Sequence, residues 1–92
     1  MIQTFRCKQT EILYEGGNPK KFRAFHLAAQ RKLEMLDVAR VIDDMRSPPG
    51  NRLEKLSGDR EGQWSIRING QWRICFEWQD GYAWNVEIVD YH

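Results

Sequence analysis

The sequence predicts an α+β domain, in which an N-terminal strand and a helical pair pack on one face of a mainly antiparallel, twisted sheet that ends in a β-meander. Two observations lead to this prediction. Apolar residues recur every three or four positions before the prolines at 48 and 49, and every second position after them. Short turn sequences then divide the second half into strands. Because 92 residues are one domain's worth of chain, we expect a single domain over residues 1–92.

The first half is expected to contain an edge strand and three helical segments. Residues 1–7 are mixed and tolerant of β-structure, and residues 10–14 predict a brief helical turn. Asn18-Pro19 begins the main helix, because Asn caps helices and Pro fits their first position. This helix has one apolar stripe, made of Phe22, Phe25, Ala29, Leu33 and Leu36. Asp37 begins a shorter helix, which ends before the two prolines because proline cannot donate a backbone hydrogen bond.

The second half is expected to be strands at 52–56, 64–68, 72–78 and 83–89. The hairpin turn at 69–71 decides which face is buried. A three-residue connection puts six large apolar residues on one side, pairing Ile68 with Trp72, Ile66 with Ile74 and Trp64 with Phe76. A two-residue Asn-Gly turn would separate Ile66 from Trp72. Since a one-residue shift exchanges the faces of a strand, we expect the apolar pattern to prevail, with a bulge or longer loop here.

The opposite face of this hairpin then carries Arg67 beside Arg73, with Ser65, Cys75, Glu77, Asn85 and Glu87 near them. Two neighbouring arginines repel each other unless an anion or a carboxylate lies between them. Two alternatives remain open, namely a bound anion and neutralisation by Glu77 and Glu87.

The tryptophans at 64, 72 and 84 fall on alternating positions and are expected in the core, whereas Trp78, close to a turn, is expected at the surface. Cys7 and Cys75 are far apart, with no Cys or His at metal-ligand spacing, and this pattern predicts reduced thiols in a cytosolic protein. No apolar run approaches the ~18 residues of a membrane span. The first residues lack the basic and apolar stretches of a secretory signal.

The net charge of +1 conceals an uneven distribution. Residues 1–34 hold seven Lys or Arg against three Glu, whereas residues 74–92 hold four acidic residues and no Lys or Arg. A protein that binds nucleic acid through bulk charge is usually far more basic. A nucleic-acid partner would therefore meet a local cluster, in which arginine suits forked contacts with phosphate oxygens.

The chain ends in Asp90-Tyr91-His92, three residues able to do proton chemistry, because His titrates near neutrality and Asp can orient an imidazole. This ending, together with the stretches 58–69 (GDREGQWSIRIN) and 71–76 (QWRICF), resembles the HigB toxins. They belong to the RelE superfamily of type II toxin–antitoxin systems and are also called plasmid maintenance killer proteins. The resemblance covers the whole chain and implies a RelE-like fold.

The resemblance implies a ribosome-dependent mRNA interferase, an endoribonuclease that cuts mRNA in the ribosomal A site and inhibits translation. The implied chemistry needs no metal and no cofactor: the ribose 2′-OH attacks the adjacent phosphate. Such a reaction needs a base, cations for the phosphate and an acid for the leaving oxygen.

Residues that match the family motif receive roles from the resemblance. His92 is expected to transfer a proton, most simply as general acid, Tyr91 to stack on or position the nucleotide, and Asp90 to orient His92 or contact the base. Arg73 is the first candidate for neutralising the scissile phosphate, and Arg67 the second. The nuclease role depends on an accessible Arg73 guanidinium beside the carboxy-terminal imidazole, and burial of Arg73 in an ion pair would count against it.

The base is left open. Some relatives have a histidine and a lysine in the loop before Gly58, where this chain has Glu54 and Ser57. Glu54 is either a general base or an inactive partner of Arg52 or Lys55. Lys55 is a candidate replacement for the missing cation, although strand alternation favours the other face. Arg60 is expected to fix its loop by pairing with an acid.

The implied partners are a helix-turn-helix antitoxin of the HigA type, the ribosome and its mRNA, and operator DNA only through the antitoxin complex, with no membrane. The implied location is the cytoplasm. Two other readings compete with the lead: a non-catalytic RelE-fold module that binds antitoxin or ribosome, and a ribonuclease that needs no ribosome.

Overall fold

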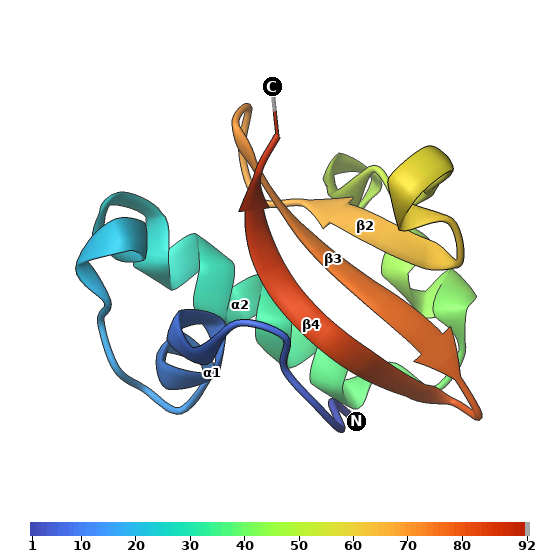
Figure 1. Cartoon of the computed structure of the whole chain (residues 1–92), viewed down its shortest axis with the longest axis horizontal. Coiled ribbons are helices and arrows are strands. Elements are labelled where there is room, and N and C mark those ends of the chain that lie inside the picture. Colours follow the sequence, from blue (N-terminus) through green and yellow to red (C-terminus); the bar gives the residue numbers. More distant parts are fainter. Residues whose placement is uncertain (92) are drawn as a thin grey trace.

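The computed structural model describes residues 1–91. Two helices, α1 (Lys8–Tyr14) and α2 (His26–Val38), precede four strands: β1 (Glu54–Lys55), β2 (Gln63–Arg67), β3 (Trp72–Gln79) and β4 (Tyr82–Asp90). Short 3₁₀ helices connect them at Lys20–Phe25, Ile42–Arg46, Pro49–Asn51 and Gly58–Arg60. The sheet has the order β1-β2-β3-β4, with each neighbouring pair antiparallel. Both helices lie on one side of it (Figure 1). The predicted α+β class is confirmed.

The predicted edge strand at the N-terminus is two isolated parallel bridges to β4. Ile2 pairs with Ala83, and Phe5 pairs with Val86. The backbone of the first residues therefore lies along β4 (Figure 1), and it covers the hydrogen-bonding groups of that sheet edge.

The predicted main helix is divided in two. A 3₁₀ segment, Lys20–Phe25, comes first, and α2 starts only at His26. Phe25 has left the helical region, with φ −132° and ψ 24°. Its ring lies 5.1 Å from the Trp72 ring, and the Phe22 ring lies 5.7 Å from Trp72. The break lets both phenylalanines contact one tryptophan of the sheet, so tertiary packing overrides the helical period here.

The predicted second helix is a 3₁₀ turn at Ile42–Arg46. The Asp44 carboxylate accepts hydrogen bonds from the backbone N–H groups of Arg40 at 2.9 Å and Val41 at 3.2 Å. These two bonds hold the pKa of Asp44 below its ordinary value. The carboxylate therefore fixes the first turn of this segment.

The predicted hairpin register is confirmed. Trp64 lies opposite Phe76 and Ile66 opposite Ile74, while the Ile68 N–H donates to the Trp72 carbonyl at 2.9 Å. The side-chain oxygen of Asn69 accepts from the N–H groups of Gln71 at 2.8 Å and Trp72 at 2.9 Å. These bonds close the three-residue connection and keep the apolar residues on one face.

Two expectations about tryptophan are wrong, and a bulge in β4 explains the first of them. Asn85 has φ 52°, and the β3–β4 register shifts between Cys75 and Glu77. The extra residue moves Trp84 to the face of its partner Glu77, so Trp84 is not on the core face where we expected it. Trp78, expected at the surface, packs against the core instead.

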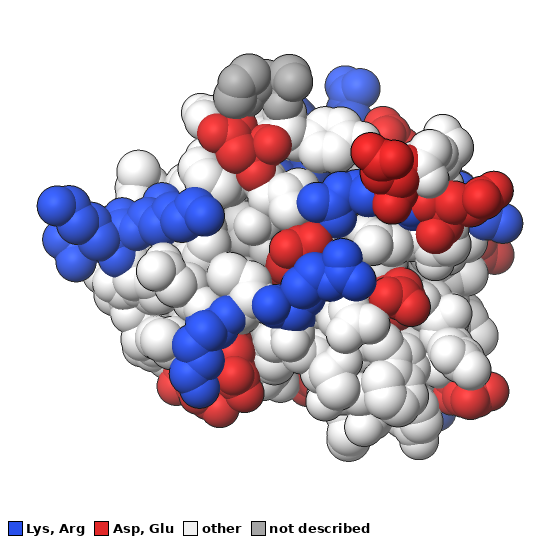
Figure 2. Space-filling view, viewed as in Figure 1, with Lys and Arg blue, Asp and Glu red and all other residues white. Residues whose placement is uncertain are grey.

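Folding brings basic residues from other parts of the chain to acidic residues of the last two strands. Glu87 of β4 lies 2.8 Å from Arg60, and Glu77 of β3 lies 3.8 Å from Arg6. Basic and acidic side chains consequently alternate across the face that carries β4, and neither sign forms a continuous field (Figure 2).

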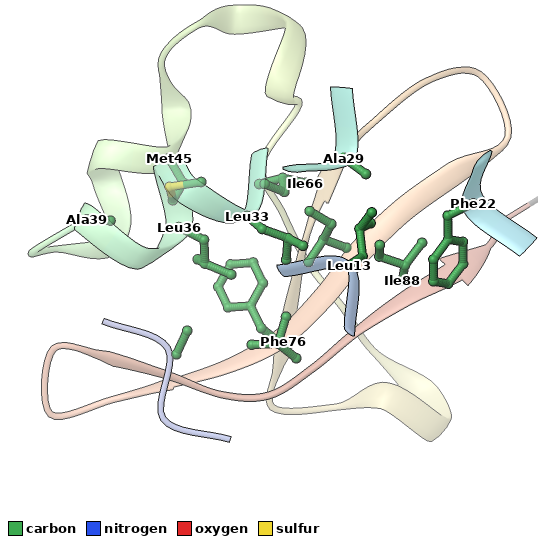
Figure 3. Close-up of a cluster of buried hydrophobic side chains, with 13 residues drawn as sticks. Leu13, Phe22, Ala29, Leu33, Leu36, Ala39, Met45, Ile66, Phe76 and Ile88 are labelled. Carbon is green, nitrogen blue, oxygen red and sulfur yellow. The ribbon is translucent and has the colours of Figure 1, made fainter. Parts of the chain in front are cut away.

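The core joins the helices to the sheet through fully buried side chains: Leu13, Phe22, Ala29, Leu33, Leu36, Ile66, Ile74, Phe76 and Val86. In Figure 3, Phe76 of the sheet is directed toward Leu36 of α2, and Ile88 lies between Leu13 and Phe22. This packing leaves the other face of the hairpin outside the core. Within residues 1–91, no helix combines the length and the apolar character that crossing a membrane requires.

We expect Leu33→Ala to lower the free energy of unfolding by about 3 kcal/mol, because it removes a buried side chain and leaves a cavity. Leu27 is the matched control, since it lies on the same helix with 65% of its surface exposed. Leu27→Ala should change stability by less than about 0.5 kcal/mol. Urea denaturation followed by tryptophan fluorescence measures both, and equal effects would contradict this description of the core.

Candidate functional site

The outer face of the β2–β3 hairpin brings the two predicted arginines together. Arg67 lies directly opposite Arg73 in the register, and Ser65 lies opposite Cys75. Glu54 of β1 pairs with Ser65, so its side chain belongs to the same face. Five side chains from three strands therefore form the floor of the candidate site.

Arg73 is buried, and this corrects the expectation of an open guanidinium. Only 7% of the residue is exposed. Its Nε donates to Ser65 Oγ at 2.8 Å, and its Nη2 donates to the Arg52 carbonyl at 2.6 Å. Glu54 lies 3.9 Å from Nη2 with a half-exposed carboxylate. Burial arises because Arg73 lies in a central strand, between β2 and β4. The buried cation joins β2 to the loop that precedes β1.

Arg67 is the more accessible of the pair, and it is half-buried. Its Nε donates to the Asn69 carbonyl at 3.1 Å. A Cβ placed on Gly70 would lie 3.7 Å from Arg67 Nη2, so the guanidinium folds back over the hairpin turn. The turn therefore holds this cation in place at the end of the sheet.

The carboxy-terminal residues meet the same end of the sheet (Figure 1). The Tyr91 ring, 42% exposed, lies 5.8 Å from the centre of the Arg73 guanidinium, within the range of a cation–π contact. The Tyr91 N–H donates to the Gln71 carbonyl at 2.6 Å, and the Gln71 amide donates to Asp90 at 3.0 Å. The structure thus brings Tyr91 to Arg73, and Asp90 to Gln71 at the same end of the sheet. His92 lies outside the described residues.

The acids expected to neutralise the arginine pair have other partners. Glu87 accepts a hydrogen bond from Arg60 at 2.8 Å, and Glu77 accepts one from Asn85, also at 2.8 Å. Among residues 1–91, the carboxylate beside Arg73 is that of Glu54. The alternative of neutralisation by Glu77 and Glu87 is therefore wrong for the described side chains.

Arg60 fixes its loop by pairing with an acid, as predicted. The same Nη1 atom that contacts Glu87 also donates to Gln63 at 3.0 Å. The hydrogen bond to Glu87 raises the pKa of the Arg60 guanidinium. Cys75, the partner of Glu87 in the β3–β4 register, is fully buried, and burial raises the pKa of its thiol.

Lys55 is not part of this face. It pairs with Trp64, and its ammonium lies 5.7 Å from the centre of the Trp64 ring. Strand alternation directs Lys55 to the face opposite Glu54. The Glu54 carboxylate pairs with Arg73. The alternative in which it pairs with Arg52 or Lys55 is therefore wrong for the described side chains.

Sequence reasoning placed Ser65 beside the arginines, and Arg73 does donate to it. It missed two other residues of the site, namely Arg52, whose carbonyl accepts from Arg73, and Gln71, which contacts both Asp90 and Tyr91. The geometry of the hairpin could have indicated the contact of Gln71 with the end of β4. The first residues of β3 lie opposite the last residues of β4, so a three-residue turn places Gln71 beside the chain end. Arg52 gives no such signal, because a non-glycine residue at φ 45° is not expected there.

Within residues 1–91, no three His, Cys, Asp or Glu side chains gather in an arrangement that could hold a metal ion. The polar groups of the face are suited to another ligand. The half-buried Arg67 can donate to an anionic, planar molecule, the exposed Tyr91 ring offers it a stacking surface, and the buried Arg73 adds positive charge.

Comparison with known proteins gives consistent matches along the whole chain. A family model for the RelE-like toxin of the type II toxin–antitoxin system HigB matches residues 3–92. Toxin HigB-1 of Vibrio cholerae serotype O1 is 44% identical over 90 residues, covering 96% of this chain and 95% of that protein. Endoribonuclease HigB of Proteus vulgaris is 33% identical over 93 residues and covers both proteins in full.

Solved structures show the same fold. A chain of the YoeB–YefM toxin–antitoxin heterotetramer from Staphylococcus aureus aligns with a TM-score of 0.63 and 18% identity, covering 100% of this chain and 98% of that chain. A second YoeB–YefM complex from the same organism gives a TM-score of 0.58. The predicted RelE-like fold is confirmed.

We expect Arg73→Ala to lower the free energy of unfolding by about 2 kcal/mol, because it leaves the buried Ser65 hydroxyl and the Arg52 carbonyl without their donor. Arg67→Ala is the matched control, since Arg67 is half-buried and makes one hydrogen bond to the backbone. It should cost about 0.5 kcal/mol. Chemical denaturation of both variants gives the comparison, and a smaller loss for Arg73→Ala would show that its contacts do not join the loop to the sheet.

Proposed function

The chain belongs to the HigB family of RelE-like toxins of type II toxin–antitoxin systems, and on that premise we propose that it is an endoribonuclease that cuts mRNA in the ribosomal A site and so inhibits translation. The observation that supports this most directly is the position of Tyr91 over the Arg73 guanidinium. That contact brings Tyr91 to a face with two arginines and a carboxylate. A relative of full-length similarity has the name Endoribonuclease HigB.

The proposed reaction is an internal phosphoryl transfer. The ribose 2′-oxygen attacks the adjacent phosphorus, and the bond from phosphorus to the 5′-oxygen of the next nucleotide breaks. The products are a 2′,3′-cyclic phosphate and a 5′-hydroxyl. One group must accept the 2′-OH proton, and another must donate a proton to the departing 5′-oxygen.

We assign the two proton transfers to Glu54 and His92. Glu54 has a half-exposed carboxylate on the site face, so it can accept the 2′-OH proton from a bound nucleotide. His92 would donate the proton to the leaving oxygen, because an imidazole titrates near neutrality. Asp90 would orient that imidazole, and the exposed Tyr91 ring would stack on a base.

The two arginines have different parts in this proposal. Arg67, the more accessible, contacts the scissile phosphate. Arg73 adds positive charge from below and holds Tyr91 and the Arg52 loop in position, since its Nε and Nη2 atoms already donate to the protein. A fixed cation in a partly dry site stabilises developing negative charge without reorganising during the reaction. Lys55, on the other face, has no part.

The proposed partners follow from the family. A HigA-like helix-turn-helix antitoxin would bind the toxin and prevent its access to the ribosome, and the complex would bind operator DNA through the antitoxin. The two solved structures compared above are toxin–antitoxin complexes. Because the proposed substrate is mRNA on translating ribosomes, the proposed location is the cytoplasm. A small net charge of +1 is compatible with this substrate, because the ribosome presents the message.

A non-catalytic toxin-fold module remains the second candidate function, and the observation that favours it is the Glu54–Arg73 pair. If that pair serves only to hold β1 on the sheet, the chain binds antitoxin or ribosome without cutting RNA. A ribonuclease that needs no ribosome is the third candidate. Mapping of RNA ends separates all three.

We expect the purified protein to cut a reporter mRNA at codon-phased positions when ribosomes translate it, and to leave naked RNA intact. His92→Ala should slow cleavage at least about 100-fold, because the leaving oxygen loses its acid. His26→Ala is the matched control, since the His26 ring contacts the Arg23 carbonyl at the start of α2. Primer extension locates the cuts. Cuts in naked RNA would favour the third candidate, and growth arrest without cuts would favour the second.

We expect Glu54→Gln to reduce the single-turnover rate of cleavage about 100-fold with less than a threefold change in the half-saturating toxin concentration, because the amide cannot accept the 2′-OH proton. Glu61→Gln, an exposed residue of the loop before β2, is the control and should cleave normally. An unchanged rate for Glu54→Gln would leave Glu54 only as the partner of Arg73.

A further inference from the structure

Gln71 makes two contacts with the carboxy-terminal residues, although its own side chain is exposed and has no place in the core. Its backbone carbonyl accepts from the Tyr91 N–H at 2.6 Å, and its side-chain amide donates to Asp90 Oδ2 at 3.0 Å. We propose that Gln71 is a positioning residue for the cleavage reaction, which holds Asp90 and Tyr91 at the end of the sheet. This inference rests on the proposed function.

The first argument concerns the rigidity of the turn that holds Gln71. Asn69 Oδ1 accepts from the Gln71 and Trp72 N–H groups, at 2.8 and 2.9 Å. The Ile68 and Asn69 N–H groups both donate to the Trp72 carbonyl, at 2.9 and 3.3 Å. These four bonds fix Gln71 relative to the sheet, and therefore relative to Arg67 and Arg73 on the same hairpin.

The second argument concerns the place where the sheet ends. Trp72 and Asp90 form the last pair of the β3–β4 ladder. Tyr91 follows β4, and the Gln71 carbonyl accepts its N–H. Gln71 thus extends the pairing by one residue beyond the ladder. The chain end would otherwise leave the sheet at Asp90, and terminal residues without such contacts are poorly ordered.

The third argument concerns the side chain alone. The Gln71 carbonyl would hold the Tyr91 N–H with any residue at this position, but only the amide can donate to Asp90 Oδ2. The carboxylate orientation thereby depends on the residue type at 71. Since the proposed role of Asp90 is to orient the terminal imidazole, Gln71 acts on the reaction through Asp90 and does not need to touch the RNA.

We expect Gln71→Ala to lower the maximal single-turnover rate about 10- to 100-fold, because small displacements of a catalytic group have effects of that size. The half-saturating toxin concentration should change less than threefold. The melting temperature should stay within about 4 °C of the wild type, since an exposed hydrogen bond adds little stability. Gln79→Ala is the matched control: Gln79 is an exposed glutamine at the other hairpin turn, and its replacement should leave the rate unchanged.

The Gln71→Glu variant tests whether the Gln71 side chain orients Asp90 or only occupies space. The substitution keeps the size of the side chain but places a carboxylate against the Asp90 carboxylate, so its rate should fall below that of Gln71→Ala. A residue that only fills space would tolerate glutamate. A double-mutant cycle with Asp90→Ala tests the route, because Gln71→Ala should have less than a twofold further effect once Asp90 is absent.

The outcomes distinguish this inference from the proposed function. Absence of cleavage by the wild type would overturn the proposed function. Cleavage by the wild type together with normal rates for Gln71→Ala and Gln71→Glu would overturn the inference alone. The inference would also be overturned if the rate reductions of Gln71→Ala and Asp90→Ala multiplied in the double variant, since Gln71 would then act independently of Asp90.

Discussion

The register between β2 and β3 is the constraint on which the other features depend. Pairing Ile66 with Ile74 sends the apolar side chains of both strands toward α2, and the same pairing places Arg67 opposite Arg73 on the outer face. A shift of one residue in one strand would turn its arginine toward α2 and its apolar side chains away from the core. The bonds accepted by Asn69 Oδ1 close the three-residue turn that this register requires. One side chain in a turn therefore supports both the hydrophobic core and the position of the site.

Arg73 connects the parts that this register brings together. Its guanidinium links Ser65 of β2, the Arg52 carbonyl before β1 and the Tyr91 ring after β4. A buried charge is costly unless hydrogen bonds satisfy it, and here the satisfying groups come from separate segments of the chain. Because these segments must meet to satisfy the buried charge, Arg73 favours one arrangement of them. The result is a fixed positive charge beneath an exposed aromatic ring.

Family membership and site geometry support different parts of the function. Matches over residues 3–92 show the toxin family, and the RelE-like fold is shared with YoeB at 18% identity. At that identity the fold persists while side chains change, so the chemistry must be argued from the residues of this chain. Glu54 is such a case, because the proton acceptor that we propose is the carboxylate beside Arg73.

The sequence alone determined the α+β class, the positions of the three strands after residue 62 and the register of the β2–β3 hairpin, because each depends on local periodicity or on pairs that turn geometry brings together. Only the tertiary structure decided where the helix breaks at Phe25, which face Trp84 occupies after the bulge at Asn85, and how deeply Arg73 is buried. These features depend on contacts between segments distant in sequence, such as Phe25 with Trp72 or Arg73 with Arg52. The spacing of apolar residues along the chain does not predict such contacts, because the burial of one residue depends on which other elements cover it.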